Sequence, residues 1–402
     1  MLNILREELR HEDSSVLLLS YTNRAVDEMC SKLMESGIDF LRVGNRHACE
    51  KAYLPYMVEE KISGCKKLSD IVGILKGTRV VCATVSTLNS HAELLRMRHF
   101  SLAIVDEASQ ILEPYIVGIL SARNGDGESS IGRFVLIGDH KQLPAVVLQG
   151  EADTRVADPL LADADVTDCR HSFFQRLLRR YAANEDITYM LTRQGRMHRD
   201  IASFPSAAFY SGKLKPVPLP HQECELPGTT EDDNSPYETL LLTRRVAFID
   251  VPSPPQSSSD KVNTLEADII ARIAVAAYRL REDRFSVRQS LGIIVPYRNQ
   301  IATVRKAIDR YGIKELHDIT IDTVERYQGS QRDVVIYGFT IRHRYQLNFL
   351  TSNDFEEDGV VIDPKLNVAM TRARENLVLV GNKKLLSFDP VFRRMINSLN
   401  SI

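Results

Sequence analysis

The chain has 402 residues, of which 44% are hydrophobic and 26% charged, and its formal net charge is −2 at pH 7. This composition fits an ordinary globular protein of two or three domains and excludes a strongly basic chain, so any nucleic-acid surface must be local. No apolar run is long enough to cross a bilayer, and residues 1–8 predict an amphipathic helix instead of a secretory signal. The six cysteines show no zinc-type spacing, so we expect reduced thiols in a cytoplasmic protein.

The first half of the sequence alternates short apolar runs with helical patterns, which is typical of a parallel α/β fold. The predicted strands are residues 16–19, 79–83, 102–105 and 134–137. A helix is expected to follow the first strand and to end near residue 34. Residues 45–76 predict a small helical excursion from the core, whereas 123–128 and 150–165 predict polar surface loops.

A second strand and helix pattern begins near residues 187–191. The further predicted strands are 246–249, 291–295, 320–324, 334–337 and 377–380, and the predicted helices are 265–280 and 298–311. Residues 216–238 and 252–260 predict exposed segments, and the Pro- and Ser-rich composition of the latter is unsuited to a packed element. The sequence therefore predicts an α/β protein with two parallel-sheet domains, residues 1–185 and 186–402.

Two carboxylates follow the predicted strand 102–105. Asp106 and Glu107 stand at its carboxyl end, which is where open α/β sheets bind ligands. An Asp there can hold Mg²⁺, and the next Glu can orient and deprotonate an attacking water. Such a pair normally works with a Gly-rich phosphate loop (P-loop) that ends in Gly-Lys-Ser/Thr, and the 402 residues contain none. The chain carries half of a nucleotide-hydrolysing site.

A polar loop leaves the neighbouring predicted strand 134–137. It contains Gln142, whose amide can donate to or accept from a γ-phosphate, and we expect it beside the two carboxylates. The alternative is a tight turn bounded by Gly138 and Pro144.

Three further loops carry groups that suit phosphate. Arg372 could reach across a domain cleft as an arginine finger, although an R-x-R pair such as Arg372 and Arg374 is more often a solvated face. Arg196 could enter the same cleft or belong to a simple basic turn. The loop 327–333 between two strands could touch phosphate or ribose.

Other strand ends offer hydroxyl and amide groups for a nucleic-acid backbone. Thr22 and Asn23 follow the first strand, Thr84 ends the second, and Tyr297 with Arg298 follows a strand of the second half. Such groups bind phosphate without a large positive charge. Each one alone is more often a helix cap, so only their repetition points to a track for nucleic acid.

Taken in order, these loops resemble the motifs of superfamily 1 helicases, in the branch that contains the nonsense-mediated-decay and Okazaki-processing helicases. The resemblance covers nearly the whole chain. Its motifs are residues 20–27 (Ia), 84–87 (Ic), 106–110 (II), 138–146 (III), 194–198, 295–300, 324–333 (V) and 367–374 (VI).

The resemblance implies two RecA-like parallel-sheet domains, the first lacking its P-loop strand, with ATP between them. The implied partner is single-stranded or partly duplex nucleic acid, DNA more than RNA. Asp106 would hold Mg²⁺ and Glu107 would act as catalytic base. Gln142 would couple the γ-phosphate to the strand-binding loops, and Arg196 and Arg372 would contact that phosphate. Further nucleotide contacts are implied for Gln194, Gly329, Gln331 and Arg374, and contacts with the strand for Thr22, Asn23, Thr84, Tyr297 and Arg298.

The sequence departs from the helicase pattern at three places. The P-loop is absent, Gly195 stands where relatives carry a base-stacking Tyr, and Gln331 replaces the usual Glu. We expect the P-loop strand to be central and beside strand 102–105, so that its loss leaves two rows of unpaired backbone groups and a chain that is poorly soluble or nucleotide-inactive by itself.

Two functions remain open at this point. The favoured one is the carboxyl-terminal part of an ATP-dependent helicase or translocase whose P-loop lies upstream. The alternative is a nucleic-acid-binding remnant without ATP turnover, although such a remnant would need none of Glu107, Gln142, Arg196 and Arg372.

Overall fold

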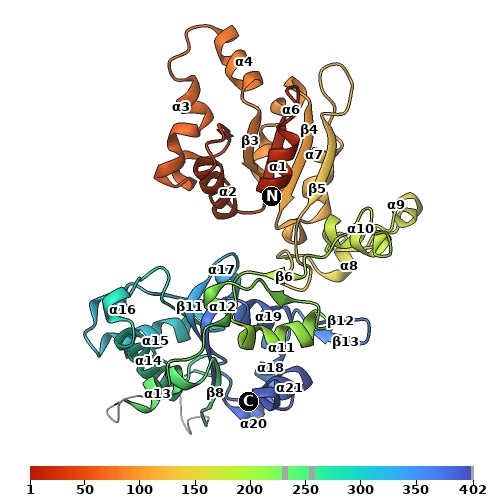
Figure 1. Cartoon of the computed structure of the whole chain (residues 1–402). Helices are drawn as coiled ribbons and strands as arrows, with labels where there is room; N and C mark the ends of the chain where they lie inside the picture. Colours follow the sequence, from red (N-terminus) through yellow and green to blue (C-terminus); the bar gives the residue numbers. More distant parts are fainter. Residues whose placement is uncertain (229–233, 253–258, 400–402) are drawn as a thin grey trace. The chain divides into compact units, whose positions relative to one another are not determined.

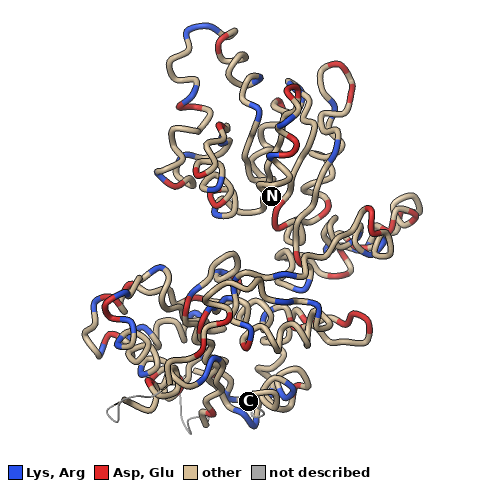
Figure 2. Tube along the Cα trace, viewed as in Figure 1, with Lys and Arg blue, Asp and Glu red and all other residues tan. Residues whose placement is uncertain are grey.

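The computed structural model describes residues 1–228, 234–252 and 259–399. The chain divides into two compact units (Figure 1). Unit 1 comprises residues 1–140 and 144–189, and unit 2 comprises residues 141–143 and 190–402. Lys and Arg alternate with Asp and Glu along both units, as expected for a net charge near zero (Figure 2).

Unit 1 is built on a five-stranded, all-parallel sheet with the strand order β2-β3-β1-β4-β5. The strands are β1 (Val16–Ser20), β2 (Leu41–Arg42), β3 (Val80–Thr84), β4 (Phe100–Asp106) and β5 (Ile131–Leu136). Four of them match the predicted strands. The sequence did not predict β2, because two residues are too short for an alternating pattern to show.

The buried side chains of β1 divide between two cores because successive residues of a strand point to opposite faces. Leu17 and Leu19 pack in one hydrophobic cluster, and Val16 and Leu18 pack in the other. The helices of unit 1 are α1 (Leu2–Glu8), α2 (Asn23–Glu35), η1 (Arg46–Ala48), η2 (Lys51–Tyr56), α3 (Val58–Ile62), α4 (Leu68–Gly77), α5 (Val85–Ser90), α6 (Glu93–Met97), η3 (Ala108–Gln110), α7 (Glu113–Leu120), α8 (Glu151–Thr154), α9 (Pro159–Asp163) and α10 (Phe173–Tyr181).

Unit 2 contains a second five-stranded parallel sheet with the order β10-β9-β11-β14-β8. Its strands are β8 (Val246–Asp250), β9 (Leu291–Ile294), β10 (Thr320–Asp322), β11 (Arg332–Gly338) and β14 (Ala373–Gly381), and two small pairs are formed by β6 (Arg193–Gln194) with β7 (Lys215–Pro216) and β12 (Phe355–Glu357) with β13 (Val360–Ile362). The predicted α/β fold with two parallel sheets is confirmed.

The helices of unit 2 cover both faces of this sheet, with Val335 and Leu377 in one core and Val334 and Val378 in the other. They are α11 (Arg199–Phe209), α12 (Pro220–Glu223), α13 (Pro236–Thr243), α14 (Thr264–Arg279), η4 (Glu282–Arg284), α15 (Arg298–Asp309), α16 (Lys314–His317), α17 (Val324–Tyr327), η5 (Arg344–Gln346), α18 (Leu347–Leu350), α19 (Pro364–Met370), α20 (Lys383–Leu386) and α21 (Pro390–Leu399). Among the described residues, no helix is both long enough and apolar enough to cross a membrane.

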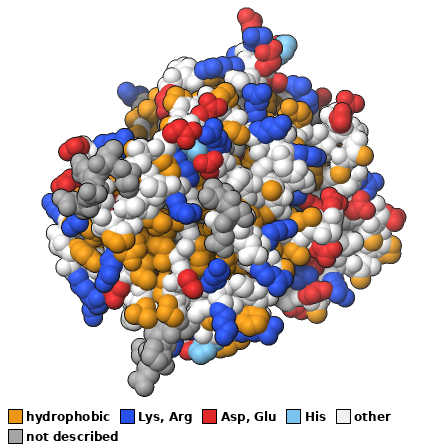
Figure 3. All heavy atoms as spheres, turned by 60° about the horizontal axis from the view of Figure 1, so that its bottom comes forward, with side chains coloured by type: hydrophobic (Ala, Val, Ile, Leu, Met, Phe, Trp, Pro, Cys, Tyr) orange, Lys and Arg blue, Asp and Glu red, His pale blue; other side chains and the backbone are white. Residues whose placement is uncertain are grey.

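Hydrophobic side chains also reach the surface. Figure 3 shows them gathered in one area of the face drawn there, with Lys and Arg around them. A cavity of about 590 Å³ beside α13 and α14 has such a wall, to which Tyr237, Leu240 and Val275 contribute.

The expected strand at residues 187–191 is wrong. These residues form no strand, Tyr189 and Leu191 are 86% and 71% exposed, and the chain pairs only at β6. The side chains of this apolar run are exposed, so its apolar pattern does not reflect burial in a sheet.

The two segments expected to be exposed give a mixed outcome. Residues 216–238 contain α12, where Gln222 is fully buried, so this expectation is wrong for that part. Residues 229–233 of this segment and residues 253–258 of the second lie outside the described residues.

The expected position of the P-loop strand is also wrong. Strand β4, which ends at Asp106, already pairs with β1 on one side and β5 on the other. The edges of the sheet are β2 and β5, so a further strand could pair only there and its absence leaves one unpaired row, not two.

Candidate nucleotide and nucleic-acid sites

Asp106 and Glu107 form a fixed turn at the carboxyl end of β4. The Glu107 amide donates to Asp106 Oδ1 over 3.0 Å, and Gln110 Nε2 donates to Glu107 Oε2 over 2.8 Å. Glu107 has φ 54° and ψ 35°, the left-handed conformation that a non-glycine residue adopts at a cost of about 1 kcal/mol or more. Backbone strain of this kind is concentrated at functional sites, so the turn is a candidate for chemistry.

The loop that leaves β5 begins beside this turn. The Ala108 amide donates to the carbonyl of Ile137 over 2.8 Å, and Ser109 Oγ donates to the carbonyl of Asp139 over 3.1 Å. A Cβ on Gly138 would lie 2.8 Å from the Ser109 amide nitrogen, which is too close. Glycine at this position therefore allows the two loops to pack backbone to backbone.

The last residues of three strands of unit 1 are aligned at the carboxyl end of the sheet. Ser20 at the end of β1 is paired in register with Thr84 of β3 on one side and Asp106 of β4 on the other. Thr84 is 4% exposed, and its hydroxyl accepts from the Thr87 amide over 3.1 Å. Asp106, the candidate Mg²⁺ ligand, and Thr84, a candidate contact for nucleic acid, thus lie at the same end of one parallel sheet.

The loop after β1 begins α2. Thr22 is the N-cap, and its hydroxyl accepts from the Ala25 amide over 3.2 Å. The Asn23 Oδ1 accepts from Arg42 Nη2 over 2.9 Å, which leaves the Asn23 amide nitrogen as the side chain's donor end. The cap interpretation therefore holds for Thr22, and both side chains lie at a helix start where backbone amides point outward.

The buried side chain of Arg42 stabilises this loop through its hydrogen bond to Asn23. It is 1% exposed, its Nη1 donates to the carbonyl of Val43 over 2.7 Å, and its Nε lies 3.4 Å from Asp27 Oδ1. Sequence reasoning missed Arg42 and Asp27. The available signal was an arginine inside the apolar run of residues 40–43, because a buried charge needs a partner.

Residues 141–143 pack with unit 2. There Gln142 Oε1 accepts from Arg372 Nη2 over 3.3 Å, and the Lys141 carbonyl accepts from Asn367 Nδ2 over 2.8 Å. Arg372 is only 2% exposed, and it also donates to the carbonyl of Val368 over 3.1 Å. The predicted γ-phosphate sensor and the predicted finger are therefore hydrogen-bonded to each other.

Arg196 lies at the amino ends of β11 and β14. Its Nε donates to Gln331 Oε1 over 3.1 Å, and its Nη1 donates to the carbonyl of Thr371 over 3.1 Å. Because Thr371 precedes Arg372, the structure brings Arg196, Gln331 and Arg372 to one end of the sheet. Gly329, with φ 77°, belongs to the same loop as Gln331.

Gln194 folds the loop that carries Arg196. Its Oε1 accepts from the amides of Arg196 and Met197 over 2.9 and 2.7 Å, and its Nε2 donates to the carbonyl of Met197 over 2.8 Å. All three hydrogen bonds lie within residues 194–197, so the Gln194 side chain stabilises the conformation of its own loop.

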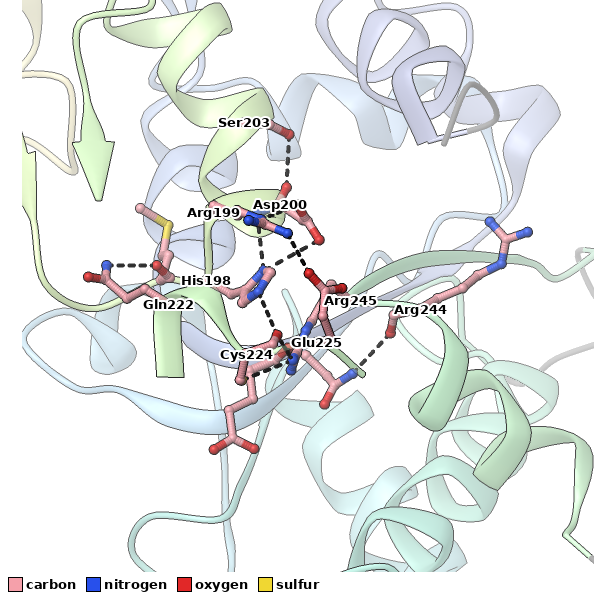
Figure 4. Close-up of polar contacts among 12 residues, drawn as sticks. His198, Arg199, Asp200, Ser203, Gln222, Cys224, Glu225, Arg244 and Arg245 are labelled. Carbon is pink, nitrogen blue, oxygen red and sulfur yellow. Dashed lines mark hydrogen bonds and ion pairs between the residues drawn. The ribbon is translucent and has the colours of Figure 1, made fainter. Parts of the chain in front are cut away.

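Helix α12 also supports this loop, through Gln222, which is labelled in Figure 4, and through His221. Gln222 Nε2 donates to the carbonyls of Gln194 and Met197, each over 2.9 Å, and His221 Nε2 lies 3.0 Å from the carbonyl of Arg196. Sequence reasoning missed these residues, because no local pattern links α12 to a loop more than twenty residues earlier.

His198 closes this support as a neutral imidazole. Burial lowers the pKa of His198, and its Nδ1 accepts from the Asp200 amide over 3.2 Å. Nε2 must then carry the proton, which it donates to the carbonyl of Cys224 over 3.1 Å. Arg245 Nη2 donates to the same carbonyl over 2.7 Å (Figure 4).

Arg374 forms an ion pair. Its Nη1 lies 3.0 Å from Asp333 Oδ1, and burial raises the pKa of Asp333 while Arg374 and other arginines lower it. The alternative interpretation of Arg374 as part of a solvated face fits only in part, because its side chain is half-buried and its guanidinium pairs with Asp333.

Tyr297 and Arg298 lie at the carboxyl end of β9, whereas Arg196 and Arg372 lie at the amino ends of β11 and β14. The structure therefore separates the two predicted groups of unit 2 by the length of the sheet. Tyr297 is 8% exposed with its ring against Phe349, and Arg298 is exposed.

Each unit offers groups that suit a nucleotide. In unit 1, Asp106 and Glu107 offer carboxylate oxygens, which suit Mg²⁺. In unit 2, the guanidinium groups of Arg196 and Arg372 suit phosphate oxygens. Within the described parts of the chain, no group of three or more His, Cys, Asp or Glu side chains could hold a metal ion. Asp106 would therefore bind Mg²⁺ only together with phosphate oxygens and water, and the sequence holds no lysine-bearing phosphate loop.

Two family comparisons cover most of the chain. The AAA_12 family model, described as an AAA domain, matches residues 169–384, which is more than half of the chain. The AAA_11 model, also described as an AAA domain, matches residues 66–149.

Curated relatives match along 96% of the chain. The DNA replication ATP-dependent helicase/nuclease of Arabidopsis thaliana is 30% identical over 393 residues, and that of Homo sapiens is 30% identical over 415 residues. Regulator of nonsense transcripts 1 of Dictyostelium discoideum is 27% identical over 428 residues. The chain spans 26%, 34% and 28% of the lengths of these three relatives.

Among solved structures, the Arterivirus nonstructural protein 10 (helicase) matches 97% of this chain and 57% of its own chain, with 12% sequence identity and a TM-score of 0.45. A TM-score at that level does not establish a common fold along the whole chain.

Proposed function

Because the chain belongs to the AAA_12 family of AAA domains, within the superfamily 1 helicases of the nonsense-decay and Okazaki-processing branch, we propose that it is the motor region of an ATP-dependent DNA helicase or translocase. Units 1 and 2 would be its two RecA-like domains, and they meet at residues 189 and 190, close to the boundary after residue 185 that the sequence predicts. The observation that carries the proposal is the register of Thr84, Ser20 and Asp106 at one sheet edge.

That register links the two activities of such a motor. Thr84 is a strand-contact candidate and Asp106 is the metal-ligand candidate, and both are the last residues of strands that pair with β1. A displacement of Asp106 would be transmitted to Thr84 through the sheet, because a packed sheet deforms little. Thr22, Asn23 and Arg298 would add further contacts to the DNA backbone.

For the nucleotide, Asp106 would hold Mg²⁺, which when bound neutralises the charge of the phosphates. Glu107 would accept the proton of the attacking water, and Arg196 and Arg372 would face the γ-phosphate, with Gln194, Gly329, Gln331 and Arg374 around them. The hydrogen bond from Arg372 to Gln142 supports a coupling role for Gln142. A further segment would supply the phosphate-binding loop, and its strand would pair with an edge strand of the first sheet, for which we propose β5.

The experiment that tests the strand-binding half is an anisotropy titration of a fluorescein-labelled oligodeoxythymidine at several salt concentrations. We expect affinity to fall linearly with the logarithm of salt concentration, because bound phosphates release counterions. Arg298→Ala should reduce that slope by about 1. Arg310→Ala, at the other end of α15 and paired with Asp268, should not. No salt-dependent binding by the chain would contradict the proposal.

The nucleotide half has its own test with the same purified chain. We expect no stoichiometric Mg²⁺-dependent binding of ATP in equilibrium dialysis, because carboxylates repel phosphates and the phosphate cradle is missing. One bound ATP per chain would show that these residues suffice and would contradict this part of the proposal.

A further inference from the structure

Three aromatic side chains are exposed close together in unit 2. Tyr345, Phe349 and Phe388 are 60%, 44% and 49% exposed. The first two belong to η5 and α18, which follow β11, and the third follows α20. Single exposed aromatics need no explanation, but a cluster of them marks a binding surface.

The ring of Tyr345 is held in place. Its hydroxyl donates to Asp260 Oδ2, and its ring lies parallel to that of His343, with centroids 5.6 Å apart and an angle of 8° between the planes. A ring that is both fixed and exposed loses little conformational entropy when a second planar group stacks on it.

Tyr345 forms a wall shared by two cavities of about 460 Å³ each. One cavity is also lined by Tyr297 and Asn299, which belong to the loop proposed to contact DNA. The other is lined by Arg344, Asn348 and Phe388, among others. The aromatic surface is therefore continuous with the proposed strand-binding loop and extends it past Tyr345.

Positive charge accompanies the aromatic rings. The Arg344 guanidinium lies 4.5 Å from the centroid of the Phe388 ring, and Lys261 lines the cavity beside Tyr297. The carboxylates that line the two cavities accept hydrogen bonds, Asp260 from Tyr345 and Asp389 from two amides of α21. Rings with adjacent cations are what single-stranded nucleic acid binds, by base stacking and phosphate contact.

We propose that a base of single-stranded DNA stacks on Tyr345 while the flanking phosphates contact Arg344 and Lys261. The proposal rests on the proposed function and names where the strand goes beyond the Tyr297 loop. Tyr345 would then supply an aromatic ring for base stacking, which Gly195 cannot supply at the position where relatives carry a Tyr.

The test measures affinity for a labelled oligodeoxythymidine and for the same strand with abasic sites throughout. Tyr345→Ala should weaken binding of the first by about 5- to 150-fold, the range of one stacked base, and should leave the abasic strand unaffected. Tyr345→Phe keeps the ring and should retain most of the affinity. Tyr311→Ala, which removes a 44% exposed tyrosine at the end of α15, is the control.

The outcomes separate this inference from the proposed function. If the wild-type chain binds neither strand, the proposed function fails. If it binds the oligodeoxythymidine but Tyr345→Ala, folded by circular dichroism, binds equally well, the stacking inference alone is overturned. An equal loss on the abasic strand would also overturn it, as would a Tyr345 effect confined to the matching oligouridine.

Discussion

At the residue scale, close packing and strain decide the shape of the candidate catalytic turn. Glu107 adopts a left-handed conformation, and Gly138 allows the neighbouring loop to touch Ser109. Neither feature is needed to end a strand. Both are explained if the Glu107 carboxylate must point in one particular direction.

Gly138→Ala should destabilise unit 1. The added Cβ would lie 2.8 Å from the Ser109 amide nitrogen, so the two loops must separate, at a cost of about 1–3 kcal/mol. Gly73→Ala is a matched control, because that glycine lies within α4 with open space around it and should stabilise by about 0.5–1 kcal/mol. Chemical denaturation measures both, and equal effects of the two variants would refute the packing argument.

Glu266 should make the stability of unit 2 depend on pH. Burial raises its pKa from the ordinary 4.5 to about 8, despite two hydrogen bonds from Thr340. The folded state then holds a proton that the unfolded state has lost between about pH 4.5 and 8, so stability falls as pH rises, by up to about 1.4 kcal/mol per unit. Glu266→Gln should remove this slope, as measured by denaturation at pH 5, 6.5 and 8. An unchanged slope would mean that Glu266 ionises freely.

At the element scale, helix α12 and strand β2 show how short elements position candidate site loops. β2 contributes Arg42, which orients Asn23, and α12 contributes Gln222, which binds the loop of Arg196. Neither element has a periodic pattern, and each acts through one buried polar side chain.

Gln222→Ala should loosen the Arg196 loop. Removing the amide deletes two hydrogen bonds, each worth about 0.5–1.5 kcal/mol of stability, although both carbonyls keep a second donor, the Val217 amide and Gln194 Nε2. Glu223→Ala, an exposed neighbour on α12, should change stability by less than about 0.5 kcal/mol. Urea denaturation compares the two, and a Gln222 variant as stable as the Glu223 variant would show that the loop supports itself.

The sequence predicted the long elements well because their apolar patterns are local. The β1, β4, β9 and β14 strands appear in it as buried runs, and α14 and α15 as periodic segments. It could not predict contacts between distant segments, such as Gln222 with Gln194 or Arg372 with Gln142. The strand at 187–191 failed because an exposed apolar run has the same letters as a buried one.

At the scale of the whole molecule, the chain consists of two units, each with its own sheet and cores on both faces. The order of the first sheet corrects the expected position of the phosphate-loop strand. Strand β4 pairs with β1 on one side and β5 on the other, so a phosphate-loop strand could pair only at an edge strand of this sheet, β2 or β5.

Limited proteolysis should cleave the chain first near residues 189 and 190, where unit 1 ends and the main part of unit 2 begins. Tyr189 is 86% exposed in a segment without helix or strand, whereas Tyr345 and Tyr115 are 60% and 58% exposed and lie within helices η5 and α7. Brief chymotrypsin treatment should therefore give two fragments that meet near residue 189, identified by intact mass. A first cut within β9, β11 or β14 would contradict the division into two stable units.

We propose Glu107 as the general base of ATP hydrolysis, and this role can be measured directly. The most direct measurement is DNA-stimulated ATP hydrolysis by the protein purified from its own source, with the wild-type gene and with Glu107→Gln at the same locus. We expect hydrolysis by the wild type and a loss of turnover of at least about 100-fold in the variant, because the general base is gone. Binding of single-stranded DNA should be unchanged. Equal rates for the two proteins, or a wild type that binds DNA but never hydrolyses ATP, would contradict it.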